Sequence, residues 1–339
     1  MSPNIVFSKQ YPVSSEDLPL TFISLEEWVL VRSSGPDVIK YLHNQFTCDI
    51  KNLDKSEYRF SAYCNPKGKM ISNMYVFYLK NQEMAFIARL NICEKQIVEM
   101  KKYIVSYNVA ITPDYNATLI GVAGVNARKY LSMFFSVVPT ENHTVVHEKD
   151  ITLLYFSAPT ERFLLIINNR STLDHLLSKK NSFCIQFNDS CQWALLDIEA
   201  GYPIIELVTS ELFVPQAVNM DVLQGISFNK GCYLGQESIA RIQYRGNNNK
   251  ELYRLIGSID DCKNKHKFPA AGDWVELKLN NQHWKNIGVI LQSFQIKKNN
   301  VWLQAVLNRS ILNFSELRIT NMKTHDSFIF SIIDSNKFK

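Results

Sequence analysis

The chain contains no run of about 18 apolar residues, so we expect no transmembrane helix and no membrane partner. Its first residues lack the basic segment and apolar core of a secretory signal. The Gly-Val-Ala-Gly segment at 121–124 lacks the third glycine of a dinucleotide-binding fingerprint. These absences argue against membrane, secreted and Rossmann-type classes, and they predict a cytoplasmic protein.

No C-x-x-C pair occurs among the seven cysteines, which are Cys48, Cys64, Cys93, Cys184, Cys191, Cys232 and Cys262. Their odd number and irregular spacing argue against a disulfide framework or a zinc ribbon, and for a reducing compartment. His143 and His147 stand four residues apart, but a metal site needs three or four convergent ligands. We therefore predict no metal centre.

The composition is that of an ordinary globular protein, with 46% hydrophobic and 20% charged residues. A length of 339 residues predicts two or three domains. The net charge of +5 is uneven, since 15 Lys and Arg stand against 8 Asp and Glu in residues 245–339. This basic third could face RNA or an acidic partner, but its interspersed lysines favour a solvated β-domain.

A strand-strand-helix order occurs twice in the first two thirds of the chain. Apolar segments at 75–79 and 84–88 precede an amphipathic stretch at 94–107, and segments at 151–156 and 162–167 precede a helix beginning at Ser171. The repeat predicts one two-layer α+β sandwich of ferredoxin-like type. Short strands with polar turns then predict a small antiparallel barrel, at 252–256, 274–279, 287–291, 301–306 and 317–319.

Three polar segments are candidates for chemistry. A turn at 63–73 carries Lys67 and Lys69, which indicates either a solvated hairpin or a site for an anionic tail. Glu199 follows Trp193 in an apolar setting. Its carboxylate could accept two parallel hydrogen bonds from a guanidinium or from the aminopyrimidine edge of a pterin, or it could be a helix-start carboxylate bound by backbone N–H groups.

The segment 229–237 places Cys232 between two glycines and beside Lys230. Glycines allow positive φ and close approach, and a neighbouring cation favours a reactive thiolate. The alternative is a buried cysteine in a tight turn. No histidine lies nearby in sequence to act as a base, although a distant one could fold close.

The chain resembles the YgfZ family, the folate-binding relatives of the glycine-cleavage aminomethyltransferase (T-protein). The similarity rests on Asp-Ile-Glu-Ala-Gly at 197–201, Phe-Val-Pro-Gln at 213–216, Gly-Ile-Ser-Phe at 225–228 and the family signature Lys-Gly-Cys-Tyr-Leu-Gly-Gln-Glu at 230–237. Weaker similarity extends over almost the whole chain. The resemblance implies an α+β fold with three domains in a ring, a ferredoxin-like part and a C-terminal antiparallel β-barrel.

The implied domain organisation is a folate-binding aminomethyltransferase-like region at 1–245 and a barrel at 250–330, with a boundary near Lys250. The first region would contain two interleaved domains. One would comprise about 1–55, 112–135 and 190–245, and the other about 56–111 and 136–189.

The resemblance also implies a tetrahydrofolate site facing the central hole. Trp28 and Trp193 would contact the folate, since flat aromatic side chains can lie against its rings. Glu199 would grip the pterin edge, and we expect these three residues to share one cavity with Cys232. Cations for the anionic glutamate tail would be Lys67, Lys69, Lys230 and Arg241.

One departure from the T-protein pattern concerns activity. Where the T-protein has an aspartate pair, this chain has Ser72 and Asn73, and neither ionises at neutral pH. We therefore expect no glycine-cleavage activity, and Cys232 would supply different chemistry as a functional thiol.

The resemblance implies a cytoplasmic tetrahydrofolate-binding accessory protein that supports iron–sulfur enzyme assembly or maintenance and thereby tRNA methylthiolation. Its partners would be iron–sulfur proteins such as the tRNA methylthiotransferases, and we predict no independent catalysis. The alternative is a folate-dependent methyl or aminomethyl transferase acting on an unknown substrate. Direct tRNA contact through the basic tail ranks last, because no aromatic-basic RNA motif is visible.

Overall fold

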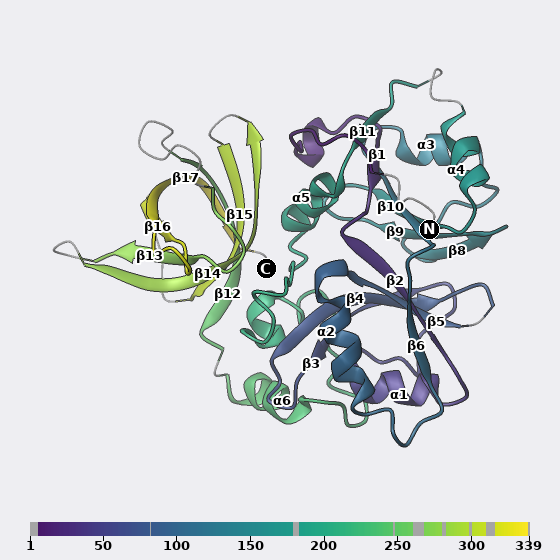
Figure 1. Ribbon diagram of the computed structural model, residues 1–339, viewed down its shortest axis with the longest axis horizontal. Helices are drawn as coiled ribbons and strands as arrows, with labels where there is room; N and C mark the ends of the chain where they lie inside the picture. Colours follow the sequence, from purple (N-terminus) through teal and green to yellow (C-terminus); the bar gives the residue numbers. More distant parts are fainter. Residues whose placement is uncertain are drawn as a thin grey trace.

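A computed structural model describes residues 6–81, 83–178, 183–246, 248–259, 268–279, 283–297, 300–309 and 316–337. It contains a five-stranded sheet, a six-stranded sheet and a closed barrel. Figure 1 shows the barrel to one side of the two sheets. Within the described residues, no helix is long and apolar enough to cross a membrane, and Cys262 lies outside those residues.

The five-stranded sheet is antiparallel. Its strands, in order, are β3 (Tyr58–Cys64), β4 (Met70–Tyr78), β5 (Met84–Arg89), β2 (Trp28–Ser34) and β6 (Ala110–Asp114). Alternate side chains of β2 enter different cores, because a strand presents successive residues to opposite faces. Val29 and Val31 pack in a core with residues of α1 (Val38–Gln45) and α2 (Leu90–Lys101), while Trp28 and Leu30 face the second sheet's core.

The six-stranded sheet is formed, in order, by β11 (Gln186–Asn188), β1 (Thr21–Ser24), β7 (Thr118–Ala123), β10 (Arg162–Ile167), β9 (Ile151–Phe156) and β8 (Val145–Glu148). One face packs with α3 (Ala127–Leu131) and α4 (Arg170–Leu177). The other face joins a large shared core with α5 (Ser190–Ala200) and the inner face of the first sheet. The candidate site lies in this shared core.

The repeated units do not form the single sandwich that their order predicted. β4 and β5 pair in the five-stranded sheet, whereas β9 and β10 pair in the six-stranded sheet. The expected helix at 94–107 begins earlier, at Leu90, and ends at Lys101. The five-stranded sheet joins strands from 58–89 with strands from 28–34 and 110–114. The division of 1–245 into two interleaved domains stays a prediction.

The C-terminal antiparallel barrel is confirmed, with six strands where five were expected. They are β12 (Lys250–Ile259), β13 (Trp274–Lys278), β14 (Trp284–Lys297), β15 (Asn300–Asn308), β16 (Glu316–Thr320) and β17 (Ser327–Lys337). The missed strand, β17, pairs with both β16 and β12 and so closes the barrel. Its signal was the alternation of Phe328 and Phe330, both buried in the barrel core.

Candidate functional site

Two tryptophans lie in the shared core, and each has an arginine over its ring. Trp28 begins β2, and the Arg89 guanidinium carbon lies 4.3 Å from its ring centroid. Trp193 lies on α5 with no exposed surface, and the Arg162 guanidinium carbon lies 4.4 Å from its ring centroid. Both arrangements are cation–π contacts in a largely desolvated setting, where such contacts are strongest.

A buried ion pair connects the surroundings of the two tryptophans. Arg162 Nη2 donates to Asp197 Oδ1 at 2.7 Å, and the Arg162 side chain is fully buried. Burial raises the pKa of Asp197, and the adjacent Arg162 guanidinium acts in the opposite direction. Asp197 also lines a small cavity with Trp28, so the two aromatic sites share one charged centre.

This small cavity, which we call the Trp28 cavity, is lined by Trp28, Asn73, Arg89, Asp197 and Tyr202 among others. Its volume is about 20 Å³, which is room for a single water molecule. Asn73 Oδ1 and the Nε and Nη1 atoms of Arg89 are buried there without a hydrogen-bond partner among the described residues. Because buried polar atoms are almost always paired, these three atoms favour a polar partner in the cavity, either a water molecule or a polar group of a ligand.

The remaining guanidinium nitrogen of Arg89, Nη2, is paired with two carboxylates. Arg89 Nη2 donates to Glu27 Oε2 at 2.7 Å and to Glu206 Oε1 at 2.5 Å. Asn73 Nδ2 donates to Pro203 O at 2.9 Å, which fixes the amide and leaves its oxygen to the cavity. The unpaired atoms are therefore held in place by the paired ones.

Glu199 lies elsewhere. It is in the last turn of α5, so the alternative interpretation of a helix-start carboxylate is wrong. Ser15 N donates to its Oε2 at 3.0 Å and Ser15 Oγ donates to its Oε1 at 2.6 Å. Both carboxylate oxygens are thus used to hold the N-terminal segment 9–15, which we call the strap.

Cys232 lies in an exposed loop that is fastened by Lys230. Lys230 Nζ donates to the carbonyl oxygens of His43, Phe46 and Cys48 at 2.5, 2.6 and 2.7 Å. An ammonium has three donors, so all are used. Burial lowers the pKa of Lys230 to about 8. In this conformation Lys230 anchors the loop and has no donor left for an anionic ligand.

The contacts of Lys230 hold the Cys232 loop beside His43. This neighbour could not be predicted from the local sequence. A Cβ built on Gly231 would lie 3.9 Å from His43 Nε2, and His43 Nδ1 lies 3.3 Å from Asp49 Oδ1. Burial lowers the pKa of His43, and the Lys230 charge lowers it further. A neutral imidazole therefore lies beside the Cys232 loop, supplied by the distant helix α1.

Two of the sequence-predicted segments touch through glycines. Gly68 and Gly235 have φ of +73° and +81°, and a Cβ on Gly235 would lie 2.6 Å from Asn65 O. Only glycine permits both this conformation and this approach. The turn with Lys67 and the Cys232 loop thus form one surface.

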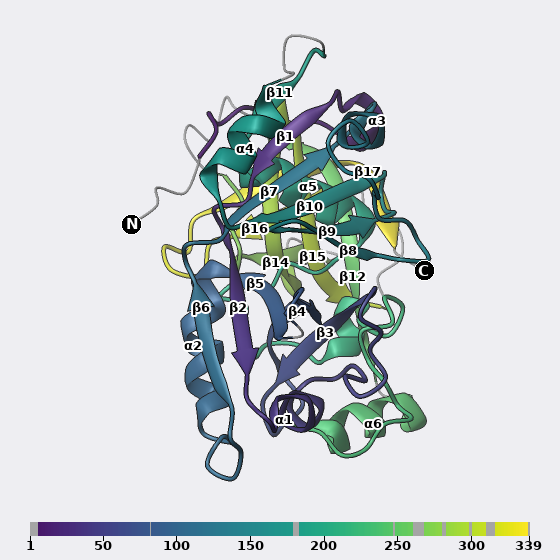
Figure 2. The same cartoon turned by 90° about the vertical axis from the view of Figure 1, so that its right-hand side faces the viewer.

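The four candidate cations do not surround the tryptophans. Lys67 is exposed, and Arg241 is an exposed partner of Glu237 at 2.9 Å on α6 (Gln236–Arg245). Lys69 lines a separate cavity of about 180 Å³ with Lys250. Figures 1 and 2 place α6 at the far end of the sheets from α5.

The expected convergence of Trp28, Trp193, Glu199 and Cys232 on one cavity is therefore not found among the described residues. Trp28 and Trp193 share the charged centre at Asp197, Glu199 holds the strap, and Cys232 lies in the exposed loop. The described residues contain no cluster of three His, Cys, Asp or Glu that could hold a metal ion.

Comparison with known proteins gives a consistent family. The family described as "YgfZ, beta-barrel domain" matches residues 248–322. The tRNA-modifying protein YgfZ of Blochmanniella pennsylvanica is 70% identical over 330 residues, covering 97% of this chain and 99% of that protein. The protein of the same name from Sodalis glossinidius is 46% identical, covering 94% of each.

Among solved structures, the glycine cleavage system aminomethyltransferase T from Bartonella henselae has a TM-score of 0.65 at 13% sequence identity. The similarity covers 93% of this chain and 85% of that one, and it establishes a shared fold. The two sequence relatives show that the chain belongs to the family of tRNA-modifying proteins called YgfZ.

Proposed function

We propose that this protein is a cytoplasmic tetrahydrofolate-binding accessory protein that supports iron–sulfur enzymes, such as the tRNA methylthiotransferases, and thereby tRNA modification. The observation that carries the folate part is the set of three unpaired buried polar atoms, on Asn73 and Arg89, beside Trp28. The tRNA-modifying part is supported by the sequence relatives, which are named tRNA-modifying proteins.

The residues of the Trp28 cavity fit the chemistry of a pterin. Trp28 offers a flat ring, Asn73 Oδ1 offers an acceptor, and Arg89 offers two nitrogen atoms, Nε and Nη1, whose N–H groups are unpaired among the described residues. The volume of about 20 Å³ is too small for the ring, so the segment 202–204 that lines the cavity has to move on binding. When bound, tetrahydrofolate supplies a one-carbon carrier, and the chain binds and orients it.

The same residues explain an accessory role better than glycine cleavage. Asn73 Nδ2 is bound to Pro203 O, and Ser72 Oγ is bound to Gln96 Oε1 at 2.7 Å in the core beside α2. Neither side chain can exchange a proton as a carboxylate does near neutral pH. Asp197 is the carboxylate at this cavity, and its ion pair with Arg162 is the observation that favours the second candidate, a one-carbon transferase.

Calorimetric titration of the purified chain with tetrahydrofolate tests the binding. We expect binding by the wild-type protein and an affinity loss of about tenfold for Trp28→Ala, which corresponds to about 1.4 kcal/mol. Trp284→Phe, on β14 of the barrel, is the matched control and keeps the wild-type affinity. An absence of binding to the wild-type protein overturns the proposal. Turnover of a one-carbon donor by the purified chain would establish the transferase instead.

The role of the thiol needs a test in cells. In a strain that lacks the protein, we expect Cys232→Ala to leave tRNA methylthiolation low, while the wild-type chain restores it. Cys184→Ala is the control, because Cys184 is also an exposed cysteine. Full restoration of iron–sulfur enzyme activity and tRNA modification by Cys232→Ala would show that the Cys232 thiol is not needed for the function.

A further inference from the structure

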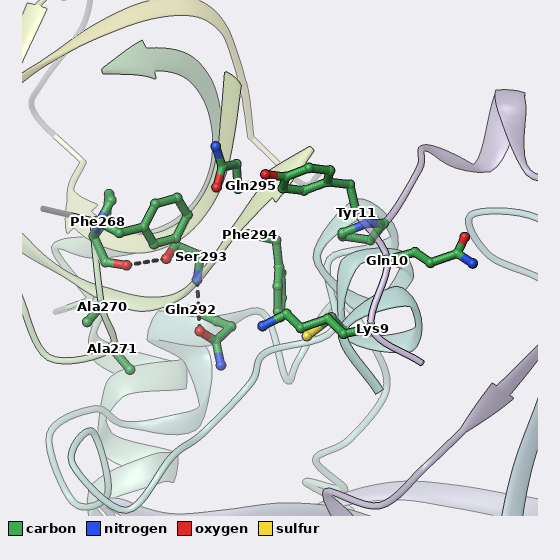
Figure 3. A pocket seen from close by; sticks show the side chains of 13 residues that line it. Lys9, Gln10, Tyr11, Phe268, Ala270, Ala271, Gln292, Ser293, Phe294 and Gln295 are labelled. Atoms are coloured by element: carbon green, nitrogen blue, oxygen red, sulfur yellow. Dashed lines mark hydrogen bonds between the residues drawn. The ribbon is translucent and has the colours of Figure 1, made fainter. Parts of the chain in front are cut away.

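A cavity of about 710 Å³ lies between the strap and the barrel. Figure 3 shows its lining, which we call the strap cavity: Lys9, Gln10 and Tyr11 come from the strap, and Gln292 to Gln295 come from β14. The volume is within the range of about 300–1,000 Å³ that is usual for small-molecule sites. None of the ten side chains predicted or proposed above as folate contacts or as the functional thiol lines it.

The wall of the strap cavity is uncharged over most of its extent and carries three aromatic rings. Tyr11 faces it from the strap, and Phe268 and Phe294 face it from the barrel (Figure 3). Cys191 adds a thiol, and burial raises its pKa to about 12, so the thiol is neutral at physiological pH. Such a wall suits a planar aromatic ring, which can lie between Tyr11 and the barrel.

One charge lies among the described residues of the wall. Lys9 is exposed, and its side chain extends from the strap toward the barrel strand (Figure 3). Behind the wall, the buried carboxylate of Asp189 accepts a hydrogen bond from Cys191 N at 3.1 Å. The cavity therefore combines aromatic walls with a cation at its rim, which matches a ring that carries a carboxylate.

The strap cavity is linked to the Trp28 cavity by one side chain. Gln292 lines the strap cavity, and its Nε2 donates to Glu206 Oε1 at 3.2 Å. The same Glu206 oxygen accepts the hydrogen bond from Arg89, whose guanidinium lies over Trp28. The polar contacts Gln292–Glu206–Arg89 therefore connect the two cavities.

The strap wall is held in a fixed position. Gln10 N donates to Asn188 Oδ1 at 3.1 Å, and Val13 exchanges two hydrogen bonds with the Gln192 side chain at 2.9 and 2.8 Å. With the two bonds from Ser15 to Glu199, these contacts fix the strap against α5. Tyr11 and Lys9 are therefore carried by a backbone that is anchored on one side.

From this geometry we infer that the strap cavity binds a planar aromatic carboxylate, the chemistry of the p-aminobenzoylglutamate half of folate. Its ring lies between Tyr11 and Phe294, and its carboxylate pairs with Lys9 at the rim. In taking tetrahydrofolate as the source of that ring, the inference rests on the proposed function. The other source is a free aromatic acid with no pterin attached.

The test is calorimetric titration of the full chain with two probes, p-aminobenzoylglutamate and tetrahydrofolate. We expect Tyr11→Ser and Lys9→Gln each to weaken binding of both probes at least fivefold. Lys67→Gln is measured as the competing assignment of the tail. Tyr244→Ser on α6 is the control for an exposed tyrosine, and Lys129→Gln on α3 is the control for an exposed lysine. Both controls keep the wild-type affinities.

The outcomes separate the two proposals. If tetrahydrofolate binds the wild-type chain and both strap variants equally, the inference is overturned and the proposed function stands. If tetrahydrofolate does not bind but p-aminobenzoylglutamate does, with the expected losses, the proposed function falls and the cavity is a site for a free aromatic acid. If neither probe binds at millimolar concentration, both are overturned. If Lys67→Gln lowers the affinity and Lys9→Gln does not, the inference is overturned. The glutamate tail of folate then binds at the turn 65–68.

Discussion

At the scale of single residues, Glu199 has two possible roles, a ligand contact and a structural anchor. The resemblance assigns it to the pterin edge, whereas the structure uses both of its oxygens on Ser15. We therefore predict that Ser15→Ala and Glu199→Gln weaken tetrahydrofolate binding by similar small factors, about two- to fivefold, because each loosens the strap. Calorimetric titration of both single variants and the double variant measures this.

The double variant decides between the two roles of Glu199. Residues that act through one shared hydrogen bond give non-additive losses, so the double variant should bind like either single variant. A direct pterin contact instead predicts a large loss for Glu199→Gln and none for Ser15→Ala. Asn169→Ala, at the N-cap of α4, is a control for loss of a polar anchor elsewhere.

At the scale of elements, sequence reasoning succeeded where the signal is local. The five expected barrel strands and the two strand pairs are present, because alternation and turn residues act within a few positions. The pairing of those strands into two sheets could not be predicted in the same way. β6 pairs with β2 across a separation of about 80 residues, and nothing in either segment specifies its partner.

The same limit applies to the candidate site. The Cys232 segment was recognisable by its own residue types, but its neighbour His43 comes from α1 and carries no local signal. Lys230 was expected to bind the anionic glutamate tail of folate, because the family resemblance implies a folate ligand that would pair with cations. The fold instead surrounds it with three carbonyl oxygens from the segment that ends α1. The role of a cation thus depends on acceptors that only the tertiary structure supplies.

At the scale of the whole molecule, the barrel controls the segment that closes the Trp28 cavity. Gln304 of β15 is fully buried, its Oε1 accepts a hydrogen bond from Ile204 N at 2.9 Å, and its Nε2 donates to Tyr202 O at 2.8 Å. Tyr202 and Ile204 both line the Trp28 cavity. A side chain of the barrel thus fixes the wall of a site that it does not touch.

This arrangement predicts that Gln304→Leu affects both stability and binding. The variant leaves two backbone groups unpaired, so we expect the free energy of unfolding to fall by about 2–3 kcal/mol, measured by urea denaturation. Tetrahydrofolate affinity should change as well, because the segment 202–204 is no longer held in one position. Thr324→Ala, on the turn between β16 and β17, should alter neither quantity. If Gln304→Leu loses stability but keeps the wild-type affinity, the barrel only supports the fold, and the wall of the Trp28 cavity is set by the two sheets and α5 alone.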